Sequence, residues 1–181
     1  MVCLNPPPAY AELHALSNFS FQRGASSAAE LFERAARLGY SALAITDECS
    51  LAGIVRALEA SEASGVALIV GSEVQLDDGP KLVLLASSQP AYSSICEVIT
   101  RGRRRSAKGE YALTRADVEC LHAEVLVLWP PCLARVADRD ADAAWIARHF
   151  AGRAWIAVEL HHGVDDASTL AGLQALGQRH A

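Results

Sequence analysis

The stretch ALAITDECSLAGIVRALEASEASGVALIV, residues 42–70, carries a strand, a helix and a second strand in succession. Its two ends, residues 42–45 and 66–70, are short apolar runs without alternation, which is typical of strands buried on both faces. The middle, residues 51–64, is amphipathic and is followed by Gly65, a residue that favours the end of a helix. Two strands joined by a helix predict a parallel pair with a helical crossover.

The same alternation continues on both sides of this stretch. It predicts strands at residues 11–16, 42–45, 66–70, 82–86, 125–129 and 155–160, and helices at residues 26–38, 51–64, 90–100, 114–120, 138–150 and 165–179. Residues 77–80, DDGP, form a predicted turn. The pattern indicates an α/β fold with parallel strands, either a barrel or a doubly wound sheet, and periodicity does not distinguish the two. Trp129, Trp145 and Trp155 occupy apolar positions and are predicted to lie in the core.

Composition excludes several classes of protein. The 181 residues are 51% apolar and 20% charged with a formal net charge of −5, which indicates one globular domain and excludes a disordered or fibrous chain. No apolar run approaches the ~20 residues of a membrane span, and the first ten residues contain three consecutive prolines where a secretion signal needs an apolar core. We therefore expect a cytoplasmic protein, with nucleic-acid binding confined to a local patch.

Acidic residues follow two of the predicted strands, and a histidine lies at the end of another. His14 belongs to the first strand, Asp47 and Glu48 follow the second, and Glu73 follows the third. Because barrels and open sheets place catalytic groups at the carboxyl ends of parallel strands, these side chains together predict a site. Structural alternatives remain: His14 as a packed or hydrogen-bonded residue, and Asp47 as a helix cap or turn acceptor.

Two further groups of residues are candidates for function. His161 and His162 follow the last predicted strand, and since adjacent residues point apart, one of them is expected beside His14. Residues 101–110 form a predicted connection with the densest positive charge of the chain: Arg101, Arg103, Arg104, Arg105 and Lys108. Such cations suit DNA phosphates, a solvated loop, or salt bridges to another domain of a larger protein.

Five segments of the sequence carry a resemblance to a known family. They are ELHALSNFSFQRGAS at 12–26, AITDECSLAG at 44–53, IVGSE at 69–73, TRGRRRSAKGEY at 100–111 and ELHHG at 159–163. In this order they resemble the N-terminal polymerase and histidinol phosphatase (PHP) domain of bacterial C-family DNA polymerases, most closely the error-prone, damage-associated branch. The resemblance implies a distorted seven-stranded (β/α) barrel. We expect residues 1–9 to be an extension and residues 10–181 to be a PHP domain truncated before its last strand region.

The resemblance also implies a metal site that has lost ligands. Metal-binding members carry H-x-H on the first strand, an Asp before the next Gly, T-D-H after the second strand and an acid after the third. The corresponding residues here are His14, Leu16, Arg23, Glu48 and Glu73. Leucine has no lone pair to offer, and arginine is a permanent cation without an acceptor.

We therefore expect no metal in this domain and no catalytic residue. The degenerate site comprises His14, Leu16, Arg23, Asp47, Glu48, Glu73 and His161, and its residual candidate ligands are His14, Asp47, Glu48 and Glu73. The Arg23 guanidinium is expected to fill the former metal space and to bind Glu48 or Glu73 through paired hydrogen bonds.

Three functions remain open at this stage. The first is the scaffolding domain of an error-prone DNA polymerase that acts in damage-induced mutagenesis, repair and translesion synthesis. That nucleotidyltransferase would use Mg²⁺ in a domain beyond Ala181, and its partners would be the rest of the polymerase chain, DNA and damage-response proteins. The second is a free-standing phosphoesterase that binds Zn²⁺ or Mn²⁺. The third is a protein-binding module.

Overall fold

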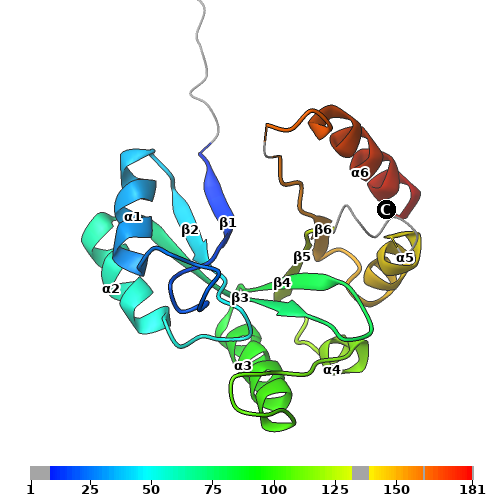
Figure 1. The fold of residues 1–181 in the computed structure, drawn as a ribbon, viewed down its shortest axis with the longest axis horizontal. Helices are drawn as coiled ribbons and strands as arrows, with labels where there is room; N and C mark the ends of the chain where they lie inside the picture. Colours follow the sequence, from blue (N-terminus) through cyan, green and yellow to red (C-terminus); the bar gives the residue numbers. More distant parts are fainter. Residues whose placement is uncertain (1–8, 132–138, 161, 181) are drawn as a thin grey trace, which may run out of the picture. The chain divides into compact units, whose positions relative to one another are not determined.

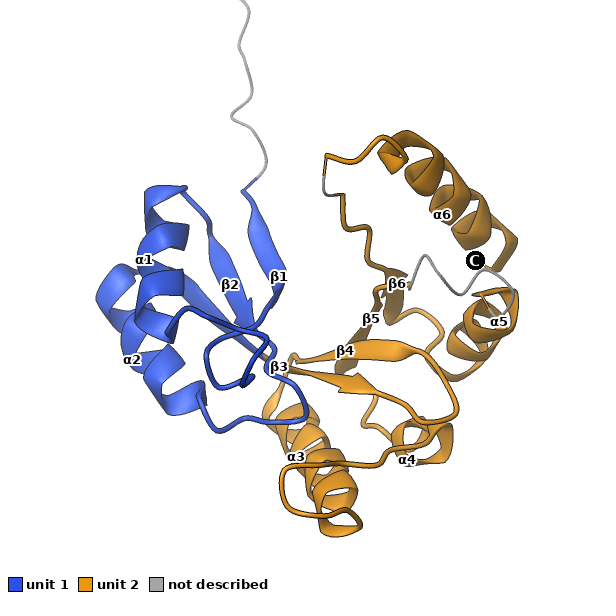
Figure 2. Ribbon diagram, in the orientation of Figure 1, with its two compact units in different colours: residues 1–70 blue, residues 71–181 orange. Residues whose placement is uncertain are grey.

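Two compact units make up the described part of the chain. The computed structural model describes residues 9–131, 139–160 and 162–180 (Figure 1). Unit 1 comprises the residues up to 70, and unit 2 comprises those from 71 onward (Figure 2). The strand β3, Ala67–Gln75, continues across this boundary, so each half is described with its own unit. Within the described ranges, no helix has both the length and the apolar character needed to cross a membrane.

Unit 1 contains parallel strands and two helices. Its elements are β1 (Ala11–Ala15), α1 (Ala28–Arg37), β2 (Ala42–Ile45), α2 (Ile54–Ser64) and the first part of β3. β1 pairs in parallel with β2, and β2 pairs in parallel with residues 67–70 of β3. The parallel pair and helical crossover predicted from residues 42–70 are confirmed.

The helix ends of unit 1 follow from local chemistry. Ser27 precedes α1 and accepts a hydrogen bond from the Glu30 backbone N–H at 3.4 Å, while the Glu30 carboxylate accepts one from the Ser27 N–H at 2.7 Å. This reciprocal pair is a capping box. α2 ends at Gly65, whose φ of 75° lies in the left-handed region that glycine adopts without a steric penalty.

An apolar core joins the helices and strands of unit 1. Phe32 of α1 is fully buried and belongs to one cluster with Leu43 and Ile45 of β2 and with Ala57 of α2. Small side chains such as Ala35 and Ala57 let the helices approach the strands closely. Phe32 is the main anchor of this core, because truncation of a buried phenylalanine to alanine typically costs about 3–5 kcal/mol.

Unit 2 is built around a mixed sheet. Its elements are the second part of β3, β4 (Lys81–Ala86), α3 (Gln89–Arg104), α4 (Arg115–Glu119), β5 (Val125–Trp129), α5 (Arg139–His149), β6 (Ala154–Ile156) and α6 (Asp166–His180). β4 pairs antiparallel with β3 and with β5, whereas β5 and β6 are parallel. Residues 82–85 of β4 are all buried, as the continuous apolar run predicted.

The expectation that all strands run parallel is wrong for β4. Only residues 76–80 connect β3 to β4, and the Leu76 N–H donates to the Pro80 carbonyl across this turn at 3.4 Å. A parallel pair needs a crossover of a dozen or more residues, whereas a short turn produces a hairpin. The mixed α/β class is nevertheless confirmed by the order of elements.

Two predicted strands have different lengths in the structure. β3 extends to Gln75, because residues 71–75 pair with β4 despite their polar character. β6 contains only residues 154–156, since its partner β5 ends at Trp129, which lies opposite Ile156. Trp129 and Trp145 are buried as predicted, but Trp155 is 52% exposed, so its assignment to the core is wrong.

Candidate functional site

Asp47 ties the loop after β1 to the end of β2 in unit 1. Its carboxylate accepts hydrogen bonds from the Ser17 N–H at 2.8 Å, the Ser17 hydroxyl at 2.7 Å and the Ser20 hydroxyl at 2.7 Å. Asp47, Ser17 and Ser20 are all buried. A buried carboxylate needs such donors, because leaving it unsatisfied would cost much more than the bonds contribute. Asp47 therefore accepts hydrogen bonds from the turn, as one of the two structural alternatives proposed for it from the sequence.

The loop itself is a tight turn that requires glycine. The backbone N–H groups of Arg23 and Gly24 both donate to the Ser20 carbonyl, at 3.0 and 2.9 Å. A Cβ atom at Gly24 would lie 1.9 Å from the Ser17 carbonyl oxygen, so no other residue fits there. The fixed turn determines where the side chain of Arg23 leaves the backbone.

Arg23 forms an ion pair with Glu48. Its Nη1 donates to Glu48 Oε2 at 2.7 Å, and the two side chains are 36% and 32% exposed. The Ser20 hydroxyl accepts a hydrogen bond from the Glu48 N–H at 3.0 Å while donating to Asp47, so one serine links the two acids. Of the two partners predicted for Arg23, the structure places Glu48 within hydrogen-bond distance.

The remaining candidates of unit 1 lie in β1 and directly after it. His14 and Leu16 are both half-buried, and the His14 N–H donates to Glu12 Oε1 at 3.1 Å. The Tyr10 hydroxyl donates to Glu12 Oε2 at 2.9 Å. This hydrogen bond to an acid raises the pKa of Tyr10 to about 12. The aliphatic Leu16 stands where active relatives were expected to carry a second histidine.

Glu73 lies within β3 in unit 2, and the prediction that it follows the strand is wrong. Its side chain is 1% exposed, and Lys81 Nζ lies 3.2 Å from its Oε1. Lys81 is paired with Gln75 across the hairpin, which places it on the same face as Glu73, two residues away. The ion pair explains how a charged residue can occupy the inside of a strand. The sequence reading missed Lys81, although the DDGP turn at 77–80 signals a hairpin.

Of the predicted histidine pair, the structure describes only His162. His161 lies outside the described residues. His162 is exposed, has a φ of 57°, and comes six residues after the end of β6 at Ile156. The strand stops early because β5 ends at Trp129, so the prediction that His162 directly follows a strand is wrong.

The basic residues predicted for a connection belong largely to a helix. Arg101, Arg103 and Arg104 lie in the last turn of α3, and Arg105 follows as its C-cap. Cations at the C-terminal end of a helix are favoured by its dipole, which helps to extend α3 to residue 104. Arg103 donates to the carbonyls of Gly109 and Glu110, at 3.1 and 3.3 Å, so it holds the following turn.

Asp117 of α4 binds two of these arginines. Arg105 donates from both terminal nitrogens to the Asp117 carboxylate, at 2.7 and 2.9 Å, and Arg101 Nη1 lies 3.7 Å from it. The same carboxylate accepts the Thr114 N–H and hydroxyl in a capping box. Burial on its own would raise the pKa of Asp117, but the Arg105 and Thr114 hydrogen bonds outweigh it and hold the pKa below its usual value.

These contacts do not fit a metal centre. Glu48 is bound by Arg23, and Glu73 is bound by Lys81. Asp47 accepts hydrogen bonds from an amide and two hydroxyls. In the part of the chain that the structure describes, no three His, Cys, Asp or Glu side chains gather into a group suited to a metal ion.

Comparison with known proteins identifies the family. A family model described as "PHP domain" matches residues 12–159, most of the chain. The chain belongs to the PHP domain family. This PHP domain has the strand and helix order described above, and the family resemblance predicted from five sequence segments is confirmed.

The PHP domain is similar to segments of much longer proteins. It is 61% identical over 171 residues to an error-prone DNA polymerase of Pseudomonas paraeruginosa, 58% identical over 168 residues to one of Pseudomonas aeruginosa, and 57% identical over 176 residues to one of Xanthomonas campestris. These matches cover 93–95% of this chain but only 16% of each relative. The chain therefore spans about one sixth of the length of the curated relatives that it matches.

A solved structure has the same fold. A protein of Bifidobacterium adolescentis, described as a metal-dependent phosphoesterase, superposes with a TM-score of 0.64 over 97% of this chain and 85% of that chain. The two sequences are 20% identical, so the likeness concerns the fold alone. Together with the PHP family match, this likeness bears out the TIM-like PHP fold that the sequence resemblance implied.

Proposed function

We propose that this PHP domain is part of an error-prone DNA polymerase that copies damaged DNA, and that it acts there as a scaffold. The observation that carries the proposal is the 61% identity over 94% of the chain to a protein of that name. Because such relatives are about six times longer, the polymerase reaction and its Mg²⁺ belong to other domains of the full protein. The proposed partners are the rest of the polymerase chain, DNA and damage-response proteins, in the cytoplasm.

We propose further that protein cations take the place of metal ions in this domain. Arg23 neutralises Glu48 in unit 1, and Lys81 neutralises Glu73 in unit 2. A divalent ion next to a guanidinium is repelled, and Leu16 supplies no ligand that would offset the repulsion. The described residues to which the resemblance assigns the degenerate site, His14, Leu16, Arg23, Asp47 and Glu48 in unit 1 and Glu73 in unit 2, are thus proposed to be structural within their own units.

Primer extension by the full-length protein tests the first proposal. The protein is expected to extend a primer with Mg²⁺ on an undamaged template and past an abasic site, whereas the 181-residue chain alone is expected to extend neither. Absence of extension by the full-length protein under conditions in which a known polymerase is active would contradict the proposal.

Metal analysis separates the scaffold from a second candidate, a PHP phosphoesterase. The fold shared with a protein described as a metal-dependent phosphoesterase is the observation that favours this alternative. We expect the purified 181-residue chain to carry zinc and manganese far below one equivalent and to leave a generic phosphodiester intact. Stoichiometric metal together with turnover that a chelator abolishes would support the phosphoesterase, with His14, Asp47, Glu48 and Glu73 as its candidate ligands.

A further inference from the structure

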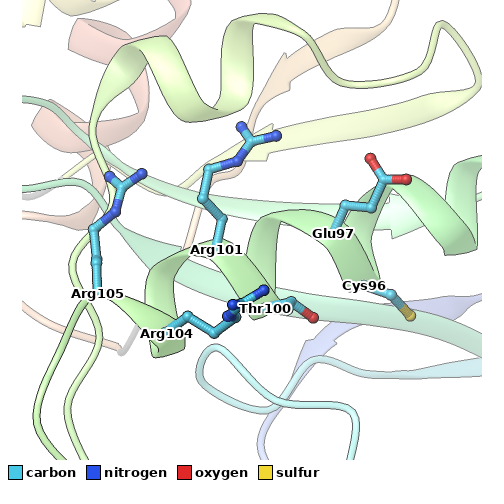
Figure 3. Close-up of a pocket in the computed structure, with 6 residues that line it drawn as sticks. All are labelled: Cys96, Glu97, Thr100, Arg101, Arg104 and Arg105. Atoms are coloured by element: carbon cyan, nitrogen blue, oxygen red, sulfur yellow. The ribbon is translucent and has the colours of Figure 1, made fainter.

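A pocket on the surface of unit 2 follows one side of α3. Two adjacent rows of side chains line it, and within each row the residues are four positions apart, so they lie on successive turns. The rows are Cys96, Thr100 and Arg104, and Glu97, Arg101 and Arg105. Figure 3 shows the second row leaving the helix in one common direction, with the first row beside it. We call this site the α3 pocket.

α4 orients two of the arginines in the α3 pocket. Arg105 is held by its paired hydrogen bonds to Asp117, and Arg101 Nη1 donates to the Asp117 carbonyl at 3.2 Å and lies 3.6 Å from Cys120 Sγ. A guanidinium has five N–H donors, so these contacts leave donors for a ligand. The side chains of Arg101 and Arg105 remain 39% and 41% exposed. They are therefore positioned in advance and still accessible to solvent.

The α3 pocket carries an excess of positive charge. Three arginines line it, Arg101, Arg104 and Arg105, whereas Glu97 is the only acid among the described residues that line it, and Asp117 of α4 pairs with two of the arginines. Arg104 is exposed at the end of α3, and the exposed Lys108 follows it in the chain. The C-terminal end of a helix repels anions, so the guanidinium charges, and not the helix dipole, must supply any attraction for an anion.

The chemistry of the lining suits phosphate oxygens. Guanidinium groups bind phosphate through paired hydrogen bonds, and the hydroxyl of the exposed Thr100 adds a neutral donor. Arg101 and Arg105 lie one turn apart, about 6 Å along the helix axis. Along the axis of duplex DNA, that distance corresponds to about two nucleotides of one strand. None of the six residues that line the α3 pocket is aromatic, so bases find no stacking surface there.

We propose that the α3 pocket binds the phosphate backbone of a nucleic-acid strand without sequence preference. The choice of a nucleic acid over other polyanions rests on the proposed polymerase function. Arg104 and Thr100 contact the backbone, whereas Arg101 and Arg105 do so while also bound to α4. The sequence reading pointed to the basic residues but missed Thr100, which only the helical arrangement places beside them.

Binding of a fluorescein-labelled dT20 strand to the 181-residue chain, followed by anisotropy between 50 and 200 mM NaCl, tests the proposal. Arg104→Glu is expected to lower the affinity about tenfold at 50 mM NaCl, because it removes a phosphate contact and adds repulsion. It is also expected to make the negative slope of log association constant against log salt concentration shallower by about 0.7 or more. Thr100→Ala is expected to weaken binding about twofold without changing the slope.

Arg148→Glu is the matched control. Arg148 is also an exposed arginine near the C-terminal end of a helix, so the change in net charge and the effect on the helix dipole are the same. Circular dichroism melts of both variants report whether each still folds. Equal losses of affinity in the two folded variants would overturn the proposal, since only overall charge would then matter.

Two further results would also overturn it. One is the absence of salt-sensitive dT20 binding by the wild-type chain. The other is competition by polyglutamate as strong as that by unlabelled dT20, which would assign the α3 pocket to an acidic protein. Primer extension by the full-length protein is independent of both results, so failure of this proposal is distinguishable from failure of the polymerase assignment.

Discussion

Asp47 in unit 1 and Asp117 in unit 2 are both buried, and each organises a functional region by different means. The hydrogen bonds described for Asp47 come from neutral groups of the preceding loop, an amide and two hydroxyls. Asp117 instead combines the neutral cap of Thr114 with two arginines. One aspartate thus fixes a turn, whereas the other gathers cations at a surface. The difference shows that both buried carboxylates organise the structure around them. Their hydrogen-bond donors decide whether positively charged side chains are held at the surface, where they can bind an anionic ligand.

The largest effect is expected from Asp47→Ala. The substitution leaves three buried donors on Ser17 and Ser20 without their acceptor, and we expect a loss of about 3 kcal/mol in the free energy of unfolding. Urea denaturation of the 181-residue chain measures it. Asp47→Asn retains one carbonyl acceptor and is expected to cost less. Equal losses in the two variants would show that the negative charge, and not the hydrogen bonds, is what Asp47 contributes.

A somewhat smaller effect is expected from Lys81→Met, which leaves Glu73 buried without its lysine. We expect a loss of about 2 kcal/mol, since removing one partner of a buried pair costs more than the pair contributes. Urea denaturation again provides the measurement. The double variant Glu73→Gln/Lys81→Met also removes the buried charge of Glu73 and is expected to recover at least half of the loss. No recovery in the double variant would argue against the ion pair as the cause.

Asp117→Asn is expected to cost about 1–2 kcal/mol at pH 7, because one carboxylate oxygen and the attraction to Arg105 are lost. The pKa of Asp117 is lowered in the folded state, so its stabilising contribution is present above the unfolded pKa of about 4 and is lost as the pH falls through the folded value. Urea midpoints between pH 7 and pH 3 should therefore converge for wild type and variant. A constant difference across this range would contradict the assignment.

The smallest effect is expected from Arg23→Met. The pair with Glu48 is about one third exposed, and such pairs contribute less than about 1 kcal/mol. We expect the loss to shrink further at 0.5 M NaCl, because salt screens exposed charges. Glu33→Met removes a more exposed acid, from an ion pair with Arg37 on α1, and serves as the control. A loss above about 2 kcal/mol in the free energy of unfolding would contradict this and would show that Arg23 stabilises unit 1 as strongly as a buried residue does.

The sequence was sufficient for much of the fold and for part of the site. Apolar runs and capping residues predicted the strand–helix order. The family resemblance offered Glu48 or Glu73 as the partner of Arg23, and the structure pairs Arg23 with Glu48. The sequence failed for Glu73, whose polar neighbours suggested a strand end, because pairing with β4 and the Lys81 charge come from residues beyond the local window.

The sequence by itself therefore determined the family and the alternation of elements, since both depend on residue type and local spacing. Only the tertiary structure decided the antiparallel hairpin at β4, the donors of Asp47 and Asp117, and the α3 pocket. These features depend on contacts between segments that are distant in the sequence. A buried polar group must be hydrogen-bonded, but the sequence around it does not specify which distant group is its partner.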